Sequence, residues 1–237
     1  MKEAYLKHCE ERKSENLPPL ALSAKQTKLV VDQLILGSDN IFFLDLLTHR
    51  VPPGVDEAAY VKAGFLTSVA IGDQKCEAIS QKRATFLLGT MLGGYNIASL
   101  IELLDVEETA ETACEALSHT ILIYEAHQSI LEKSTHNPYA KKIVDSWTEA
   151  EWFTSKEPLP ESIKVVVFRV DGETNTDDLS PATEAWSRPD IPLHAKAMLI
   201  KKMNNPLETI EKLKDKGLPL AYVGDVVGTG SSRKSAI

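Results

Sequence analysis

The hydrophobic pattern of this 237-residue chain changes once, across a proline-containing stretch at residues 154–162. Before this stretch, apolar residues recur at the three- to four-residue spacing of amphipathic helices. After it, Ile163–Val170 is rich in β-branched residues, which is typical of a buried strand. We therefore predict a multi-domain chain, with an all-α domain at 1–156, a linker at 157–162 and an α/β domain at 163–237.

The first domain is expected to contain many short helices with recognisable start signals. A longer helical region is predicted from Val106 to Lys133, with a break near Ser118. Helices of about ten to fifteen residues joined by short turns favour a HEAT-like α-solenoid array, which presents surfaces to partners. A compact helical bundle without a partner is the alternative. The predicted helix caps are Ser23, Asn40, Asp56, Ser80 and Asn137.

The second domain is expected to hold two strands with helices between them. Ile163–Val170 is followed by a predicted turn at Asp171-Gly172, a polar loop, and short helices near 194–201 and 206–216. The apolar run Leu218–Val223 predicts the second strand. Ligands of open α/β sheets bind where loops leave the carboxyl ends of strands, so polar residues in these loops are site candidates.

The second predicted strand leads into a loop rich in glycine and serine. Glycines from position 224 onward are expected to end the strand and to permit close approach of a ligand. The tip, Ser231–Lys234, carries two hydroxyls and two cations, which suit a carboxylate or a phosphate. Its spacing matches neither G-x-x-x-x-G-K-[ST] nor G-x-G-x-x-G. An ordinary Gly/Ser turn with solvated charges is the alternative.

Two other loop segments carry charged residues. Arg188 precedes Pro189, which restricts the backbone before it and favours a fixed carboxylate clamp. The alternative is a surface arginine packed on Trp186. Asp177 and Asp178 can accept protons, orient an arginine, or cap a turn.

Composition argues against several function classes. The formal net charge of −8 does not indicate nucleic-acid binding driven by overall charge. The three cysteines are widely spaced and lack a C-x-x-C pair, which fits free thiols in a reducing compartment. There is no H-E-x-x-H pattern, no secretory signal and no apolar run near the ~20 residues of a membrane helix. We expect a cytoplasmic location and no metal ligand in this chain.

Six segments together resemble the bacterial aconitase B family, and the resemblance extends over essentially the whole chain. The segments are LLTHRVPPGVDEAAYVKAGF at 46–65, LGTMLGGYNI at 88–97, ALSHT at 116–120, GETNTDDLSPA at 172–182, WSRPDIPLH at 186–194 and LPLAYVGDVVGTGSSRKSA at 218–236.

The resemblance implies part of an aconitate hydratase. This lyase interconverts citrate and isocitrate through cis-aconitate in the citric acid cycle, and the family uses a [4Fe–4S] cluster. The resemblance also implies a HEAT-like domain at 1–156, linked in the family to dimerisation and protein contacts, followed by an incomplete swivel domain. Messenger RNA binding by the apo-enzyme is a further implication.

The site residues follow from matching positions. Ser231 resembles the serine base that removes the carbon-bound proton, and it also lies among the substrate-binding residues. Ser232 and Arg233 match neighbours that bind substrate carboxylates, and Arg188 matches the other substrate-binding arginine. Asp177 resembles an active-site acid. The chemistry is consistent, because a tricarboxylate needs several cationic groups and a serine base needs surroundings that lower its pKa.

The chain departs from the family in its cysteines. The three cluster ligands of the family lie downstream, and none of Cys9, Cys76 or Cys114 matches them. Because the cluster iron is the Lewis acid that binds substrate, we predict that this chain alone has no hydratase activity. The alternative function is a non-catalytic module derived from aconitase B, in which the helical array binds a protein or RNA.

Overall fold

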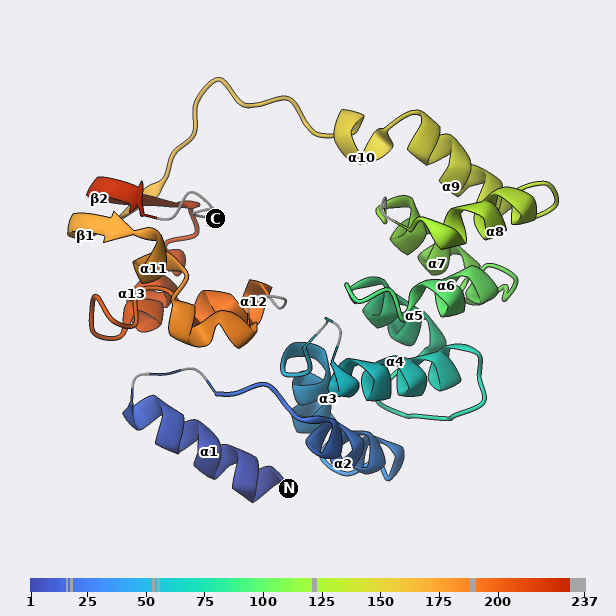
Figure 1. The fold of residues 1–237 in the computed structure, drawn as a ribbon, viewed down its shortest axis with the longest axis horizontal. Coiled ribbons are helices and arrows are strands. Elements are labelled where there is room, and N and C mark those ends of the chain that lie inside the picture. Colours follow the sequence, from blue (N-terminus) through green and yellow to red (C-terminus); the bar gives the residue numbers. More distant parts are fainter. Residues whose placement is uncertain are drawn as a thin grey trace. The chain divides into compact units, whose positions relative to one another are not determined.

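The computed structural model describes residues 1–15, 17, 19–52, 54, 56–120, 123–187 and 191–230. The chain forms two compact units (Figure 1). A helical unit spans residues 21–158, and a mixed α/β unit combines residues 1–20 with 159–237. The predicted combination of a mainly helical part and an α/β part is therefore confirmed.

The helical unit consists of short helices that follow one another in chain order (Figure 1). They are α2 (Ala24–Ile35), α3 (Asn40–His49), α4 (Glu57–Ala70), α5 (Gln81–Gly89), α6 (Ile97–Leu103), α7 (Ala110–Ser118), α8 (Glu125–Lys133), α9 (Pro138–Thr148) and α10 (Glu151–Thr154).

Each of these helices packs mainly on helices close to it in the chain. Helix α2 contacts α3 and α4, α4 contacts α5, α5 contacts α7, and α7 contacts α9. Their inner faces bury aliphatic side chains such as Leu66, Leu88 and Leu117, and removing this apolar surface from water stabilises the stack. Near-neighbour packing is compatible with the predicted array, and the HEAT-like assignment stays a prediction.

Local start signals explain the beginnings of several helices. Ser23 forms a reciprocal capping box with Gln26, and Asp56 and Ser80 accept hydrogen bonds from backbone N–H groups of the helices they precede. The predicted cap at Asn40 is wrong, because α3 already begins at Asn40 and follows Asp39, which has a left-handed backbone with φ 43°.

The long helical region predicted from Val106 to Lys133 consists of two helices. Helix α7 ends at Ser118, where the break was expected, and α8 begins only at Glu125. Both helices pack against α9.

The α/β unit contains two parallel strands and the helices between them. The elements are α1 (Lys2–Ser14), β1 (Val166–Asn175), α11 (Thr176–Leu179), the 3-10 helix η1 (Ala182–Ser187), α12 (Ile191–His194), the 3-10 helix η2 (Ala195–Ala197), α13 (Pro206–Lys214) and β2 (Leu220–Thr229).

One face of the β1–β2 ladder carries the core of this unit. Phe168 and Val170 are buried together with Leu199, and Met198 and Tyr222 pack against them. The side chains of Phe168 and Tyr222 meet edge to face, with ring centroids 5.7 Å apart. This core fixes the crossover segment on the sheet.

Both strands extend beyond the first glycine that was predicted to end them. The predicted turn at Asp171-Gly172 is wrong, because β1 continues to Asn175 after a register shift between Val170 and Glu173. Gly172 has φ +78°, and its N–H donates to the Asp225 carboxylate over 2.7 Å. Gly224 and Gly228 likewise do not end β2, which runs to Thr229 and stops just before Gly230. Pairing between the two strands outweighs the weak strand propensity of glycine here.

Candidate functional site

The two strands that precede Asp177 and Ser231 in the chain end side by side. Because the strands are parallel, their carboxyl ends lie side by side, and Asn175 of β1 pairs with Thr229 of β2. Asn175 is followed at once by α11, and Thr229 is followed by Gly230 and the serine-rich loop. The candidate site is this carboxyl edge of the sheet.

The turn from β1 into α11 is fixed by a capping box. The Asn175 side-chain oxygen accepts from the N–H groups of Asp177 and Asp178 at 2.8 and 2.9 Å. The Asp178 carboxylate accepts in return from the Asn175 N–H at 2.9 Å. Asp178 is therefore a structural cap, as one sequence interpretation allowed. Asp177 has its backbone fixed by the same box and an exposed side chain.

The end of β2 passes very close to this turn. Gly230 has φ +107°, and a Cβ atom added there would lie 3.0 Å from the Thr176 hydroxyl oxygen. The Thr229 hydroxyl also donates to the Glu173 carboxylate, which joins the two strand ends through side chains. The chain thus enters the serine-rich loop next to the turn that carries Asp177.

Most of the predicted site residues lie outside the described part of the chain. This applies to Arg188, Ser231, Ser232 and Arg233. Ser187 and Gly230 are the last described positions before them. Asp177 is the predicted site residue that the structure describes.

A partly buried hydrogen-bond cluster lies in the crossover between the strands, and sequence reasoning gave it no role. The imidazole of His194 contacts the Ser180 hydroxyl through Nε2 and the Ser187 hydroxyl through Nδ1, both at 2.8 Å. The available signal was a histidine closing the WSRPDIPLH segment, but its partners cannot be deduced from spacing.

The cysteines of this chain do not fit an iron–sulfur cluster. Cys9 and Cys76 are half-buried free thiols, and Cys114 is buried and donates to the Tyr139 carbonyl. Burial raises the pKa of the Cys114 thiol, which opposes the thiolate form that a metal requires. Among the described residues, no group of three His, Cys, Asp or Glu side chains is arranged to hold a metal ion.

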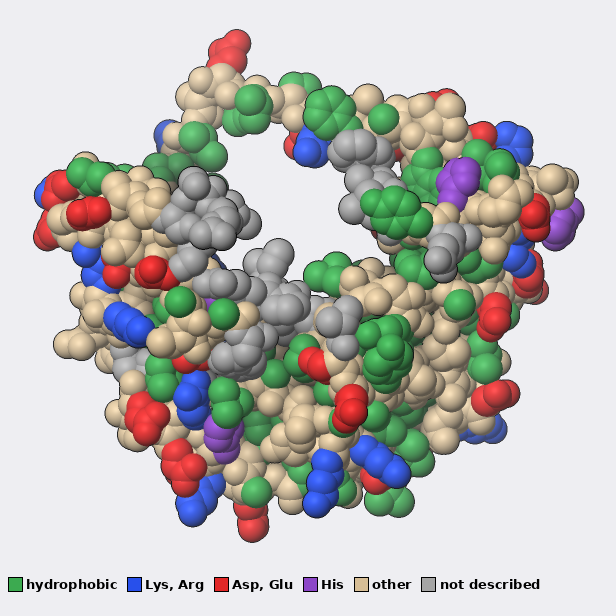
Figure 2. Space-filling model, viewed as in Figure 1, with side chains coloured by type: hydrophobic (Ala, Val, Ile, Leu, Met, Phe, Trp, Pro, Cys, Tyr) green, Lys and Arg blue, Asp and Glu red, His purple; other side chains and the backbone are tan. Residues whose placement is uncertain are grey.

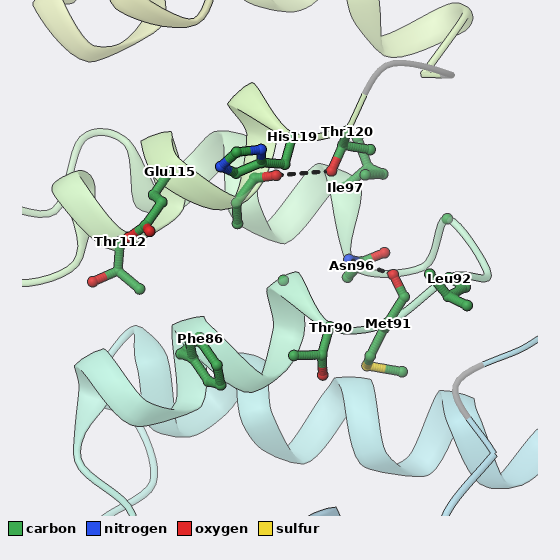
Figure 3. Close-up of a pocket in the computed structure, with 13 residues that line it drawn as sticks. Phe86, Thr90, Met91, Leu92, Asn96, Ile97, Thr112, Glu115, His119 and Thr120 are labelled. Carbon is green, nitrogen blue, oxygen red and sulfur yellow. Dashed lines mark hydrogen bonds between the residues drawn. The ribbon is translucent and has the colours of Figure 1, made fainter. Parts of the chain in front are cut away.

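A separate cavity of about 470 Å³ lies in the helical unit between α5, α7 and the segment joining α5 to α6 (Figure 3). Its floor is the close crossing of Gly89 and Ala116, where an added Cβ would lie 2.7 Å from the alanine methyl group. Asn96, which lines it, donates through Nδ2 to the carbonyls of Leu88 and Met91. The cavity is remote in sequence from every predicted site residue.

The charge distribution agrees with the acidic composition. Figure 2 shows lysine and arginine side chains interspersed with acidic side chains on the face in view. In the described ranges, no helix is both long and apolar enough to cross a membrane.

Comparison with known protein families identifies the family of this chain. Residues 4–153 match the family model of the aconitate B N-terminal domain, and residues 165–237 match that of the aconitate hydratase 2 N-terminus. The chain therefore belongs to the aconitate hydratase B family, and the resemblance seen in the sequence is confirmed.

Individual members of this family are similar in sequence to the whole of this chain. It is 53% identical to aconitate hydratase B of Pseudomonas aeruginosa over 249 residues, which covers 100% of this chain and 29% of that protein. It is 55% identical to the protein of that name from Synechocystis over 241 residues, and 52% identical to that from Escherichia coli over 249 residues. These alignments cover 28% and 29% of the two relatives, so this chain spans less than a third of their length.

Proposed function

We propose that this chain supplies one side of the active site of an aconitate hydratase, which converts citrate to isocitrate through cis-aconitate. In this proposal, residues 1–156 form a HEAT-like domain and residues 163–237 form part of a swivel domain, joined by a linker at 157–162. The supporting observation is that β1 and β2 end side by side, with Gly230 against Thr176. Loops from both strands therefore start within reach of one ligand.

The proposed roles divide between binding and proton transfer. Arg188, Ser232 and Arg233 bind substrate carboxylates, since guanidinium groups form paired, charge-assisted hydrogen bonds with them. Ser231 takes the carbon-bound proton and also contacts substrate, and Asp177 serves as an active-site acid. The remaining chemistry belongs to the part of the full-length relatives beyond this chain, where we place the ligands of the family's [4Fe–4S] cluster.

Several further expectations rest on the family alone. These are a cytoplasmic location, dimerisation through the helical domain and messenger RNA binding by the apo-enzyme. The comparisons give no support to the alternative of a non-catalytic module, because the named relatives are hydratases throughout.

The proposal is tested in a chimera in which this chain replaces the matching segment of the Escherichia coli relative. We expect the chimera to convert citrate to isocitrate and the isolated chain to show no activity. In the chimera, Ser231→Ala should lower kcat by roughly 10³-fold with little change in KM, because a proton-transfer group acts in the transition state. Arg188→Lys should mainly raise KM.

Two results would contradict this assignment. Hydratase activity of the isolated chain would show that the site is complete without further domains. An active chimera in which Ser231→Ala stays within tenfold of the parent would remove Ser231 as the base. Ser235→Ala, a serine near the same loop tip, is the matched control.

A further inference from the structure

The hydrogen-bond cluster around His194 connects the two ends of one short segment. Ser180 directly follows α11, and Ser187 is the last residue of η1. The His194 ring lies between them, with 2.8 Å from Nε2 to the Ser180 hydroxyl oxygen and 2.8 Å from Nδ1 to that of Ser187. Ser187 is buried and His194 is half-buried. A single imidazole thus spans the 180–187 segment.

The direction of the hydrogen bonds follows from their partners. The Ser187 hydroxyl donates to the Glu184 carbonyl over 2.8 Å, and a carbonyl can only accept. The single hydroxyl proton of Ser187 is therefore used, so Nδ1 of His194 must carry the proton of the Nδ1–Ser187 bond. In a neutral imidazole, Nε2 is then bare and accepts from the Ser180 hydroxyl. The cluster therefore specifies an imidazole that carries a proton on Nδ1.

The surroundings hold both ends of this tether. Glu184, in the middle of η1, forms an ion pair with Arg12 of α1 at 3.4 Å, and both side chains are largely buried. On the other side, the Leu199 N–H donates to the Asp178 carbonyl at 2.8 Å, and Leu199 is part of the core. The imidazole therefore joins two segments that are each fixed to the unit, and it sets their separation.

We propose that His194 is a positioning residue that fixes the spacing between the Asp177-bearing turn and Ser187, the residue that precedes Arg188 in the chain. Ser180 lies three residues after Asp177, and Ser187 is covalently joined to Arg188. The functional roles of Asp177 and Arg188 rest on the proposed function, whereas the tether rests on the two hydrogen bonds of His194. Removing the imidazole leaves each segment with its own contacts to the unit but removes the direct link that sets the distance between Ser180 and Ser187. Small displacements of a substrate-binding group have large effects on binding.

The first test reads the tautomer directly and needs no enzyme activity. The ¹⁵N shifts of the His194 ring are measured in the whole chain at pH 7.5, with the signal assigned by comparison with His194→Gln. We expect a protonated Nδ1 that is hydrogen-bonded. A bare Nδ1 would overturn the inference.

The second test compares variants in the active chimera. His194→Ala should raise KM for citrate about tenfold and change kcat by less than about threefold, the pattern expected when a binding group is displaced. His194→Asn places an N–H donor where Nδ1 lies. We therefore expect it to reverse at least half of the rise in KM, measured on a logarithmic scale. His49→Ala, at a largely exposed histidine of the helical unit, should leave KM unchanged.

The outcomes separate this inference from the proposed function. If His194→Ala keeps KM within twofold, or if the Asn variant is no better than Ala while both fold, His194 has no positioning role. If instead Arg188→Lys changes neither KM nor kcat, the proposed function fails, and the tautomer measurement still decides whether the tether exists. If His194→Ala does not fold, the Asn variant and the tautomer decide the matter.

Discussion

Replacing Asn137 by alanine tests how strongly the junction of α6, α8 and α9 stabilises the helical unit. The side-chain oxygen accepts from the N–H groups of Tyr139 and Ala140 at 2.9 and 3.0 Å, which caps α9. The side-chain nitrogen donates to the Leu104 carbonyl at 2.9 Å and to the Asp105 carboxylate at 3.0 Å. Alanine removes all four bonds from a side chain that is only 8% exposed.

The expected loss can be worked out from these contacts. Loss of a helix cap costs about 1 kcal/mol in the free energy of unfolding. Leaving the buried Leu104 carbonyl without this donor costs about 1–3 kcal/mol more. The Asp105 carboxylate is largely exposed and can bond to water, so its share is small. We expect a total loss of about 2–4 kcal/mol.

The assay must read the helical unit alone, because the chain has two compact units and a single transition is not assured. Hydrogen exchange at increasing urea, read by mass spectrometry on peptides of α8 and α9, meets this need. Ser80→Ala is the matched control, since Ser80 is an exposed cap whose hydroxyl accepts from the Arg83 N–H at 3.2 Å. It should cost about 1 kcal/mol. A loss below about 1 kcal/mol for Asn137→Ala, or equal losses for both variants, would refute the reasoning.

Three further predictions concern a carboxylate, a thiol and a glycine. A hydrogen bond from Lys133 is the main cause that holds the pKa of Asp105 below its ordinary value. The ionised carboxylate therefore stabilises the folded chain above about pH 4, and this stabilisation is lost as the pH falls further. Asp105→Asn should lower the urea midpoint of unfolding at pH 7 but not at pH 2.5. Burial raises the pKa of Cys114, so a disulfide reagent at pH 7 should modify the two half-buried cysteines first and reach Cys114 only at the rate of unfolding. Modification of all three at one rate would contradict this. Gly230→Ala combines a strained φ of +107° with a close contact and should cost about 1–3 kcal/mol, whereas Gly37→Ala, at φ +71° with no atom within 4 Å, should cost less; thermal melts of both variants provide the comparison.

The sequence predicted the features that depend on neighbouring residues, such as helix starts. Helix starts at Ser23, Asp56, Ser80 and Asn137 are correct, because a cap needs only the backbone two or three positions ahead. The Asn40 cap failed, although the residue type was suitable. Asp39 adopts a left-handed conformation there, so the helix starts one residue early.

Errors in the α/β unit have a different cause. Asp171-Gly172 is a strong local turn signal, yet β1 continues through it. The decisive contacts come from β2, more than fifty residues later, including the bond from Gly172 N–H to Asp225. Local propensity cannot contain that information, and strand pairing overrides it. The His194 cluster escaped prediction for the same reason, because its partners are set by the path of the crossover.

The assignments at the candidate site are linked by one close approach. The residue types make the serine-rich loop a candidate anion site and place two aspartates after the first predicted strand. They give no distance between these two loops. The contact between Gly230 and Thr176 provides the link, because a side chain at 230 would displace either the entry to Ser231 or the turn that carries Asp177. The roles proposed for Ser231 and Asp177 therefore depend on the same local geometry. If Ser231 and Asp177 serve one substrate, the two loops must approach each other closely at position 230. Glycine is then needed at this position for function as well as for the backbone conformation.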